Sequence, residues 1–136
     1  ALNKLFIELL PGNSEITDIL LKASCLNDFY STNIFSVYPV ADHILSLKID
    51  ERLRQGDVTL VNEIQNVTIN GVTRKFYSFS SKYCSHHNPK EYPIYDSYVE
   101  KVLKYFRKTD KFFKKTAECP LRLHRKADRT SRNRGV

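Results

Sequence analysis

The side chains best suited to chemistry in this sequence lie between residues 70 and 110. Cys84, His86 and His87 are close neighbours and are all of types that ligate metals. A zinc site needs about four ligands, however, and adjacent histidines point in different directions. We therefore expect a buried cysteine beside two polar histidines, and neither a metal nor another cofactor.

Asp96 is the second candidate, because it stands directly before an amphipathic pattern that includes Val99, Val102, Leu103 and Phe106. An aspartate at that place is typical of a helix N-cap, where its carboxylate accepts hydrogen bonds from the first turn and faces the positive end of the helix dipole. From the residues alone, a cap is the simpler interpretation of Asp96.

Tyrosines and lysines surround Asp96 in the sequence. Tyr92, Tyr95 and Tyr98 are interleaved with charged residues, a pattern that suits stacking on unpaired bases. Their spacing also fits burial in a core, which we favour. Lys101 and Lys104 share one face of the helix after Asp96, where they either contact phosphate or simply keep that face in water.

The elements that must position these side chains are mostly helices. Apolar spacing, together with capping and helix-ending residues, predicts a helix over about residues 15–30 and a second one that begins at Tyr38-Pro39. Further helices are expected over about residues 50–53, 57–64, 76–86 and 96–113. Asn13-Ser14 is expected to cap the first helix, and Gly56 to end the third. Val58 is expected to face inward. Asn70-Gly71 between β-branched residues predicts a two-residue β-hairpin. The fold class expected is therefore mainly α, in one compact helical domain.

Two segments resemble a known family. Ile69-Asn70-Gly71-Val72-Thr73-Arg74-Lys75 resembles the hairpin of helix-hairpin-helix DNA glycosylases, and Pro93-Ile94-Tyr95-Asp96-Ser97-Tyr98-Val99 resembles the segment that carries their catalytic aspartate. The likeness is greatest to the bacterial 8-oxoguanine glycosylase-like branch and covers residues 69–106. It implies a helix-hairpin-helix-like element within the helical domain.

The resemblance also implies roles for particular residues. Asp96 would stabilise the positive charge that develops on the sugar as the N-glycosidic bond breaks. Lys75, with Lys82 as the alternative, would be the nucleophile that forms a Schiff base with the sugar. The residues expected to contact DNA are Gly71, Thr73, Arg74, Lys101 and Lys104.

Charge supports a polyanionic partner. The chain of 136 residues has a formal net charge of +7. Residues 114–136 hold eight lysines and arginines against two acidic residues, so this segment alone carries +6. We expect residues 1–113 to form the glycosylase-like domain and residues 114–136 a basic, disordered tail that can bind phosphate through counterion release.

The composition also bears on the cellular compartment in which the protein is expected. No apolar run approaches the roughly 20 residues of a membrane span, and no secretory signal is evident. Three widely spaced cysteines are not a disulfide framework, which favours a reducing, cytoplasmic location.

Two functions follow from these observations. The first is a DNA glycosylase-like hydrolase acting in DNA repair or nucleic-acid defence on a flipped base. The second is a noncatalytic helical module that binds nucleic acid or another protein, in which Asp96 is only a cap. DNA is the expected partner under the first, and the sequence leaves the oligomeric state open.

Overall fold

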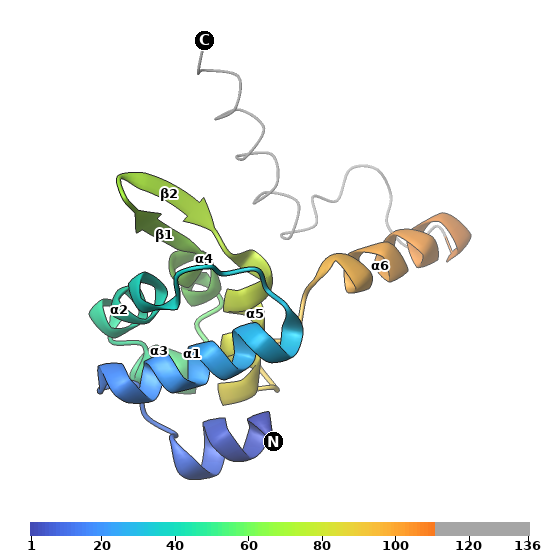
Figure 1. Cartoon of the computed structure of the whole chain (residues 1–136). Helices are drawn as coiled ribbons and strands as arrows, with labels where there is room; N and C mark the ends of the chain where they lie inside the picture. Colours follow the sequence, from blue (N-terminus) through green and yellow to red (C-terminus); the bar gives the residue numbers. More distant parts are fainter. Residues whose placement is uncertain (111–136) are drawn as a thin grey trace. The chain divides into compact units, whose positions relative to one another are not determined.

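The computed structural model describes residues 1–110 (Figure 1). Contacts divide the chain into two units, residues 1–100 and residues 101–136. The expected boundary between residues 113 and 114 falls outside the described residues. Helices predominate and the one sheet in the described part has two strands, which confirms the mainly α class. No helix within residues 1–110 is both long and apolar enough to cross a bilayer.

The helices and strands follow the order expected from the sequence, with one additional element near residue 1. That element is a short π-helix, η1. The bounds are η1 Lys4–Leu9, α1 Ile16–Tyr30, α2 Val37–Leu47, α3 Asp50–Gln55, α4 Thr59–Gln65, β1 Asn66–Ile69, β2 Val72–Lys75, α5 Tyr77–His87 and α6 Ser97–Asp110.

The core of the first unit forms where α1, α2, α4 and α5 meet. Ile19, Ala23 and Leu26 lie at helical spacing along α1 and are completely buried. Phe6 brings η1 onto the same core, because its ring packs edge-on against Tyr83 of α5 at 5.2 Å between centroids. Burial of these apolar side chains is the main term that stabilises the unit.

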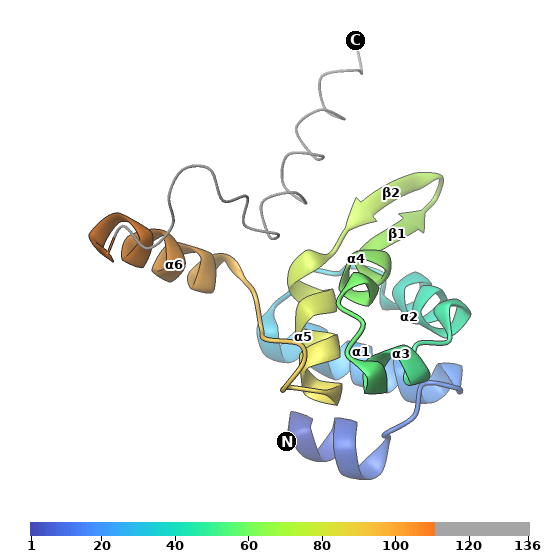
Figure 2. The same cartoon turned by 180° about the vertical axis from the view of Figure 1, so that it is seen from behind.

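The predicted hairpin is present. β1 pairs antiparallel with β2 from Asn66 opposite Lys75 to Ile69 opposite Val72. The turn needs positive φ at both central residues, and Asn70 and Gly71 have φ of 52° and 77°. In Figures 1 and 2 the hairpin and η1 lie at opposite ends of the first unit. The resemblance of this hairpin to a helix-hairpin-helix element stays a prediction.

Two local predictions are wrong. The N-cap residue of α1 is Glu15, without a capping side-chain bond, because Asn13 turns inward to other partners. Val58 is 66% exposed because it precedes α4 as the N-cap residue. The neighbouring Asp57 accepts a hydrogen bond from the Thr59 amide and so satisfies one donor of the first turn.

A fully buried lysine joins the N-terminal segment to α1. Lys22 Nζ donates to the carbonyl oxygens of Leu10 and Gly12 at 3.0 and 2.7 Å and to Asn13 Oδ1 at 2.8 Å. Burial lowers the pKa of Lys22 to about 8, and Asp50 opposes that shift. Three oxygen acceptors match the three protons of the ammonium group, which makes its burial tolerable.

Asn13 connects Lys22 to two more helices. Its backbone and side-chain N–H groups donate to the two Asp50 oxygens of α3 at 3.0 and 2.7 Å. Its Oδ1 also accepts a hydrogen bond of 2.6 Å from Tyr83 Oη of α5. We call Lys22, Asn13, Asp50 and Tyr83 the buried hub. Their hydrogen bonds join the loop that follows η1 to α1, α3 and α5.

Because several elements are joined through the buried hub, we expect a single substitution in it to lower the stability of the protein strongly. Lys22→Met keeps the approximate volume of the side chain but removes the ammonium donor from the carbonyl oxygens of Leu10 and Gly12, while Asn13 Oδ1 keeps its hydrogen bond from Tyr83. We expect the free energy of unfolding to fall by about 3 kcal/mol, the range for an unsatisfied buried network. Denaturant unfolding measures this. Lys90→Met, at an exposed position, is the matched control and should change stability by less than about 0.5 kcal/mol; an equally small effect of Lys22→Met would contradict the account.

Candidate active site

Two of the expected chemical groups meet in the structure. Lys82 Nζ of α5 lies 3.4 Å from Asp96 Oδ2, and the side chains are 5% and 29% exposed. The two residues are 14 positions apart in sequence and come from separate segments. The candidate site is therefore an amine and a carboxylate in one ion pair.

Asp96 is also the cap of α6. Its Oδ1 accepts hydrogen bonds from the amides of Tyr98 and Val99 at 3.0 and 2.9 Å. The Val99 amide and the neighbouring Lys82 lower the pKa of Asp96, so the carboxylate is ionised at neutral pH. The two oxygens divide the roles: Oδ1 caps the helix and Oδ2 faces Lys82. The capping prediction is confirmed, and the cap leaves one oxygen for other chemistry.

α5 fixes both members of the pair. Lys82 projects from the helix beside Ser78, whose Oγ accepts a hydrogen bond of 2.6 Å from Lys82 Nζ. On the same helix, Ser81 Oγ accepts a hydrogen bond of 2.8 Å from the Tyr95 amide. That bond ties the segment before α6 to α5 and so places Asp96 next to Lys82.

The third neighbour of the amine is an aromatic ring. The centroid of Tyr30, the last residue of α1, lies 5.0 Å from Lys82 Nζ, within the range of a cation–π contact. Tyr30 Oη is 3.0 Å from His86 Nε2, one turn further along α5. Lys82 is thus surrounded by a carboxylate, a hydroxyl and a ring.

The other expected site residues lie on exposed surfaces. Gly71, Thr73, Arg74 and Lys75 belong to the turn and β2, all of whose residues are exposed. Thr73 Oγ1 is 3.1 Å from Thr68 Oγ1 across the strands. Lys101 and Lys104 are exposed on α6, in the second unit. Lys82, rather than Lys75, is the lysine that the structure places against Asp96.

The residues of the possible metal cluster have different surroundings. Burial raises the pKa of the Cys84 thiol to about 12, which disfavours the thiolate that metals require. Burial and then the Lys22 charge lower the pKa of His87 to about 3, so its imidazole is neutral. Within residues 1–110, no group of three or more His, Cys, Asp or Glu side chains is arranged to hold a metal ion.

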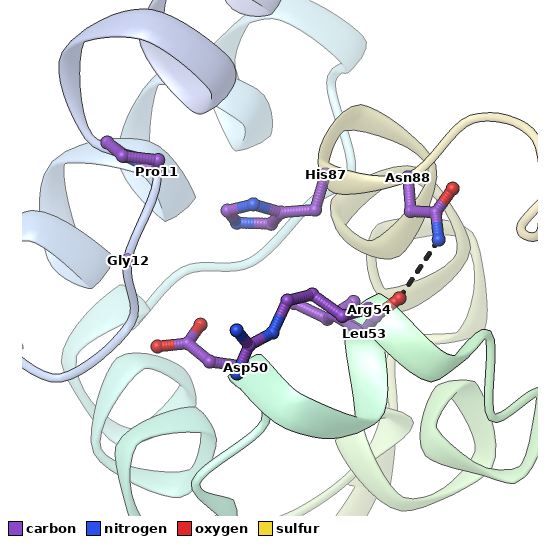
Figure 3. Close-up of a pocket in the computed structure, with 7 residues that line it drawn as sticks. All are labelled: Pro11, Gly12, Asp50, Leu53, Arg54, His87 and Asn88. Carbon is purple, nitrogen blue, oxygen red and sulfur yellow. Dashed lines mark hydrogen bonds between the residues drawn. The ribbon is translucent and has the colours of Figure 1, made fainter.

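A separate concavity lies beside the buried hub (Figure 3). Its volume is about 540 Å³, and neither Lys82 nor Asp96 lines it. In Figure 3, His87 points from the end of α5 toward the Pro11–Gly12 backbone, with Asp50 and Arg54 of α3 below it. The lining residues are Pro11, Gly12, Asp50, Leu53, Arg54, His87 and Asn88.

The sequence patterns did not predict that Tyr30, His86 and Lys22 would be partners in polar networks. A signal was present for one of them. Lys22 interrupts the apolar stripe of α1 between Ile19 and Leu26, and a charged residue at such a position must find buried partners. Tyr30 carries no comparable signal, because its contact with Lys82 joins helices that are remote in sequence.

Burial of neutral His87 predicts acid sensitivity. The folded-state pKa is about 3 and the unfolded value about 6.5, so the unfolded chain binds more protons between these limits. The contribution of His87 to the free energy of unfolding is complete above about pH 6.5. It is lost as the pH falls toward 3, by up to about 1.4 kcal/mol per pH unit. Denaturant unfolding between pH 7 and 4 should give a shallower decline for His87→Gln. An unchanged decline would show that other groups cause the acid sensitivity.

Comparisons with known proteins add a family and a relative. A family model, HI_0787_N, described as an N-terminal domain, matches residues 1–91. That match includes Lys82, the buried hub and the pocket, and ends before Asp96. An uncharacterized protein of Haemophilus influenzae is 56% identical over 98 residues, or 71% of this chain. The chain spans about half the length of that relative, since the aligned part is 49% of it. No solved structure matches the chain.

Proposed function

The chain belongs to the HI_0787_N family, and we propose that it carries a DNA glycosylase-like activity centred on Lys82 and Asp96. The observation that carries the proposal is the 3.4 Å approach of the Lys82 amine to the Asp96 carboxylate. The resemblance of residues 69–106 to helix-hairpin-helix glycosylases supports the same pair, with Lys82 in place of Lys75 as nucleophile.

Asp96 acts by its charge in this proposal. A carboxylate with a lowered pKa is a weak proton acceptor, so general-base catalysis is not its best use. An ionised carboxylate near C1′ of the sugar does stabilise the positive charge that develops as the bond to the base breaks. Because Asp96 Oδ1 is held by two α6 amides, Oδ2 is already fixed in place before substrate binds.

Lys82 supplies the new bond. After its ammonium loses a proton to water, the amine nitrogen attacks C1′ while the C1′–base bond breaks. A second proton of the amine moves, through water, to the departing base, so the base leaves as a neutral molecule. The C1′–O4′ bond then breaks as the nitrogen lone pair forms the C1′=N bond. O4′ takes from water the proton that the ammonium first released, which leaves a protonated Schiff base between Lys82 and C1′. Ser78 and Asp96 orient the amine for this attack.

The charge distribution supports DNA contact by the second unit. Residues 1–100 hold nine lysines and arginines against twelve acidic residues, whereas residues 101–136 hold thirteen against three. Lys101 and Lys104 of α6 therefore belong to the strongly basic part of the chain, which would neutralise phosphates. Arg74 and Lys75 on the exposed hairpin add basic side chains to the first unit. A cytoplasmic location is part of the proposal, since Cys25 and Cys84 are free thiols.

The proposal is tested by base excision from duplexes that carry 8-oxoguanine, uracil or an abasic site. Asp96→Asn keeps a capping oxygen and removes the charge. It should slow excision by about 100-fold or more while DNA binding is retained or tightened, because a negative charge near the polyanion is lost. Lys82→Met should abolish strand nicking and borohydride trapping, and Lys75→Met is the matched control that keeps both.

Other results would change the assignment. Trapping lost in Lys75→Met and kept in Lys82→Met would make Lys75 the nucleophile. Absence of excision by the wild-type chain across the panel would refute the activity.

One observation favours a second candidate, a noncatalytic nucleic-acid-binding module. The side chain of Lys82 is only 5% exposed, and Asp96 already has a structural task as the α6 cap. In such a module the ion pair would only fasten the start of α6 to α5. Binding that weakens steeply with salt, without excision of any base, would support this candidate.

A further inference from the structure

The amine of Lys82 is enclosed as the structure stands. Three groups surround it: Ser78 Oγ at 2.6 Å, Asp96 Oδ2 at 3.4 Å, and the Tyr30 ring, whose centroid is 5.0 Å from Nζ. Ser78 and Asp96 are polar partners that a reactive amine retains. Tyr30 differs from them, because a ring over the amine occupies space that an electrophilic carbon would need.

Tyr30 is the neighbour best placed to move. It is the last residue of α1, and the chain reverses immediately after it at Ser31, which has a left-handed φ of 50°. Its side chain is partly exposed, unlike the fully buried Leu26 one turn earlier. Tyr30 packs against the edge of the core and against the Phe29 ring, so a rotation of its side chain exchanges contacts at the end of α1 and not at its buried centre.

His86 holds Tyr30 in its present position. Burial and then the N-terminal charge lower the pKa of His86, so the neutral ring is favoured at pH 7. His86 Nδ1 is 2.9 Å from Asn3 Oδ1, an acceptor, which assigns the ring proton to Nδ1. Nε2 then accepts the hydrogen bond of 3.0 Å from Tyr30 Oη.

The contacts of Asn3, His86, Tyr30 and Lys82 form a chain in which each residue touches the next. Asn3 fixes the His86 tautomer, His86 accepts from the Tyr30 hydroxyl, and the Tyr30 ring lies over the Lys82 amine. We propose that Tyr30 is a positioning residue that covers the amine of Lys82 in the resting protein, and that the amine reaches an electrophilic carbon only after the Tyr30–His86 hydrogen bond opens. The inference rests on the proposed use of Lys82 as a nucleophile.

The test measures access to the amine and needs no substrate. The intact chain is treated with N-acetoxysuccinimide, which acetylates accessible amines, and the rate at each lysine is followed by peptide mass spectrometry. In the wild-type protein, Lys82 should react at least about tenfold more slowly than Lys48, which is exposed at the end of α2.

Two variants separate the hydroxyl from the ring. Tyr30→Phe removes only the bond to His86 and should raise the Lys82 rate roughly fivefold, the shift in population that loss of one ordinary hydrogen bond permits. Tyr30→Leu also removes the ring and should raise it further, toward the Lys48 rate. Tyr38→Phe is the matched control at an exposed tyrosine of α2 and should leave the Lys82 rate unchanged.

Melting curves accompany each variant, and Tyr30→Phe suffices if Tyr30→Leu does not fold. A Lys82 rate equal to that of Lys48 in the wild type, or one unchanged in Tyr30→Phe, would overturn the inference. The proposed glycosylase activity is tested independently of the labelling. If no DNA adduct is trapped with any substrate of the lesion panel, the role of Lys82 as a nucleophile is refuted, whereas the labelling rates of the lysines stay the same.

Discussion

Burial of ammonium groups is the constraint on which this structure depends. A lysine removed from water needs oxygen acceptors for its protons, or the cost of desolvation exceeds what packing returns. Lys22 meets that requirement with the carbonyls of Leu10 and Gly12 and with the side chain of Asn13. Because Asn13 also bonds Asp50 and Tyr83, satisfying one lysine fixes the N-terminal loop, α3 and α5 at the same time.

The candidate site is linked to the buried hub through α5, which has residues of both on two of its faces. Tyr83 and His87 are one turn apart and face the buried hub, where Tyr83 bonds Asn13 and His87 approaches Lys22. Lys82 and His86 are likewise one turn apart and both contact Tyr30. Once the first face is fixed, the rotation of α5 directs Lys82 and His86 toward Tyr30, because residues four apart share one face of a helix. The hub therefore sets which side of α5 carries Lys82, and Ser78, Asp96 and Tyr30 then hold its amine.

The sequence predicted the elements well because their signals are local. Apolar periodicity located α1 and α2, Asn88-Pro89 marked the end of α5, and Asp96 marked the start of α6. The Asn70-Gly71 pair predicted a turn that requires two positive φ values. The wrong predictions concern residues whose local preference is overridden by partners that are distant in the sequence. Asn13 is a good capping residue, but the structure uses its amide for Lys22 and Asp50, and the α1 N-terminus has no side-chain cap.

The candidate site was predictable in part. The pattern before α6 identified Asp96 as a cap, and the cap is present. Its pairing with Lys82 depends on Ser81 tying the Tyr95 amide to α5, a contact between segments that no spacing rule reveals. Tyr30 joins the site from a helix some 50 residues earlier. Sequence alone therefore provided candidates for the chemistry, and tertiary packing decided which lysine meets the carboxylate.

The most direct measurement is the location of a covalent adduct. The chain would be incubated with an oligonucleotide containing an abasic site, reduced with borohydride and digested, and the modified peptide sequenced by mass spectrometry. If Lys82 is the nucleophile, we expect a single reduced adduct on Lys82, in the α5 peptide. An adduct on Lys75, on the N-terminal amine or spread over the exposed lysines would contradict the claim that the Lys82–Asp96 pair is the reactive centre.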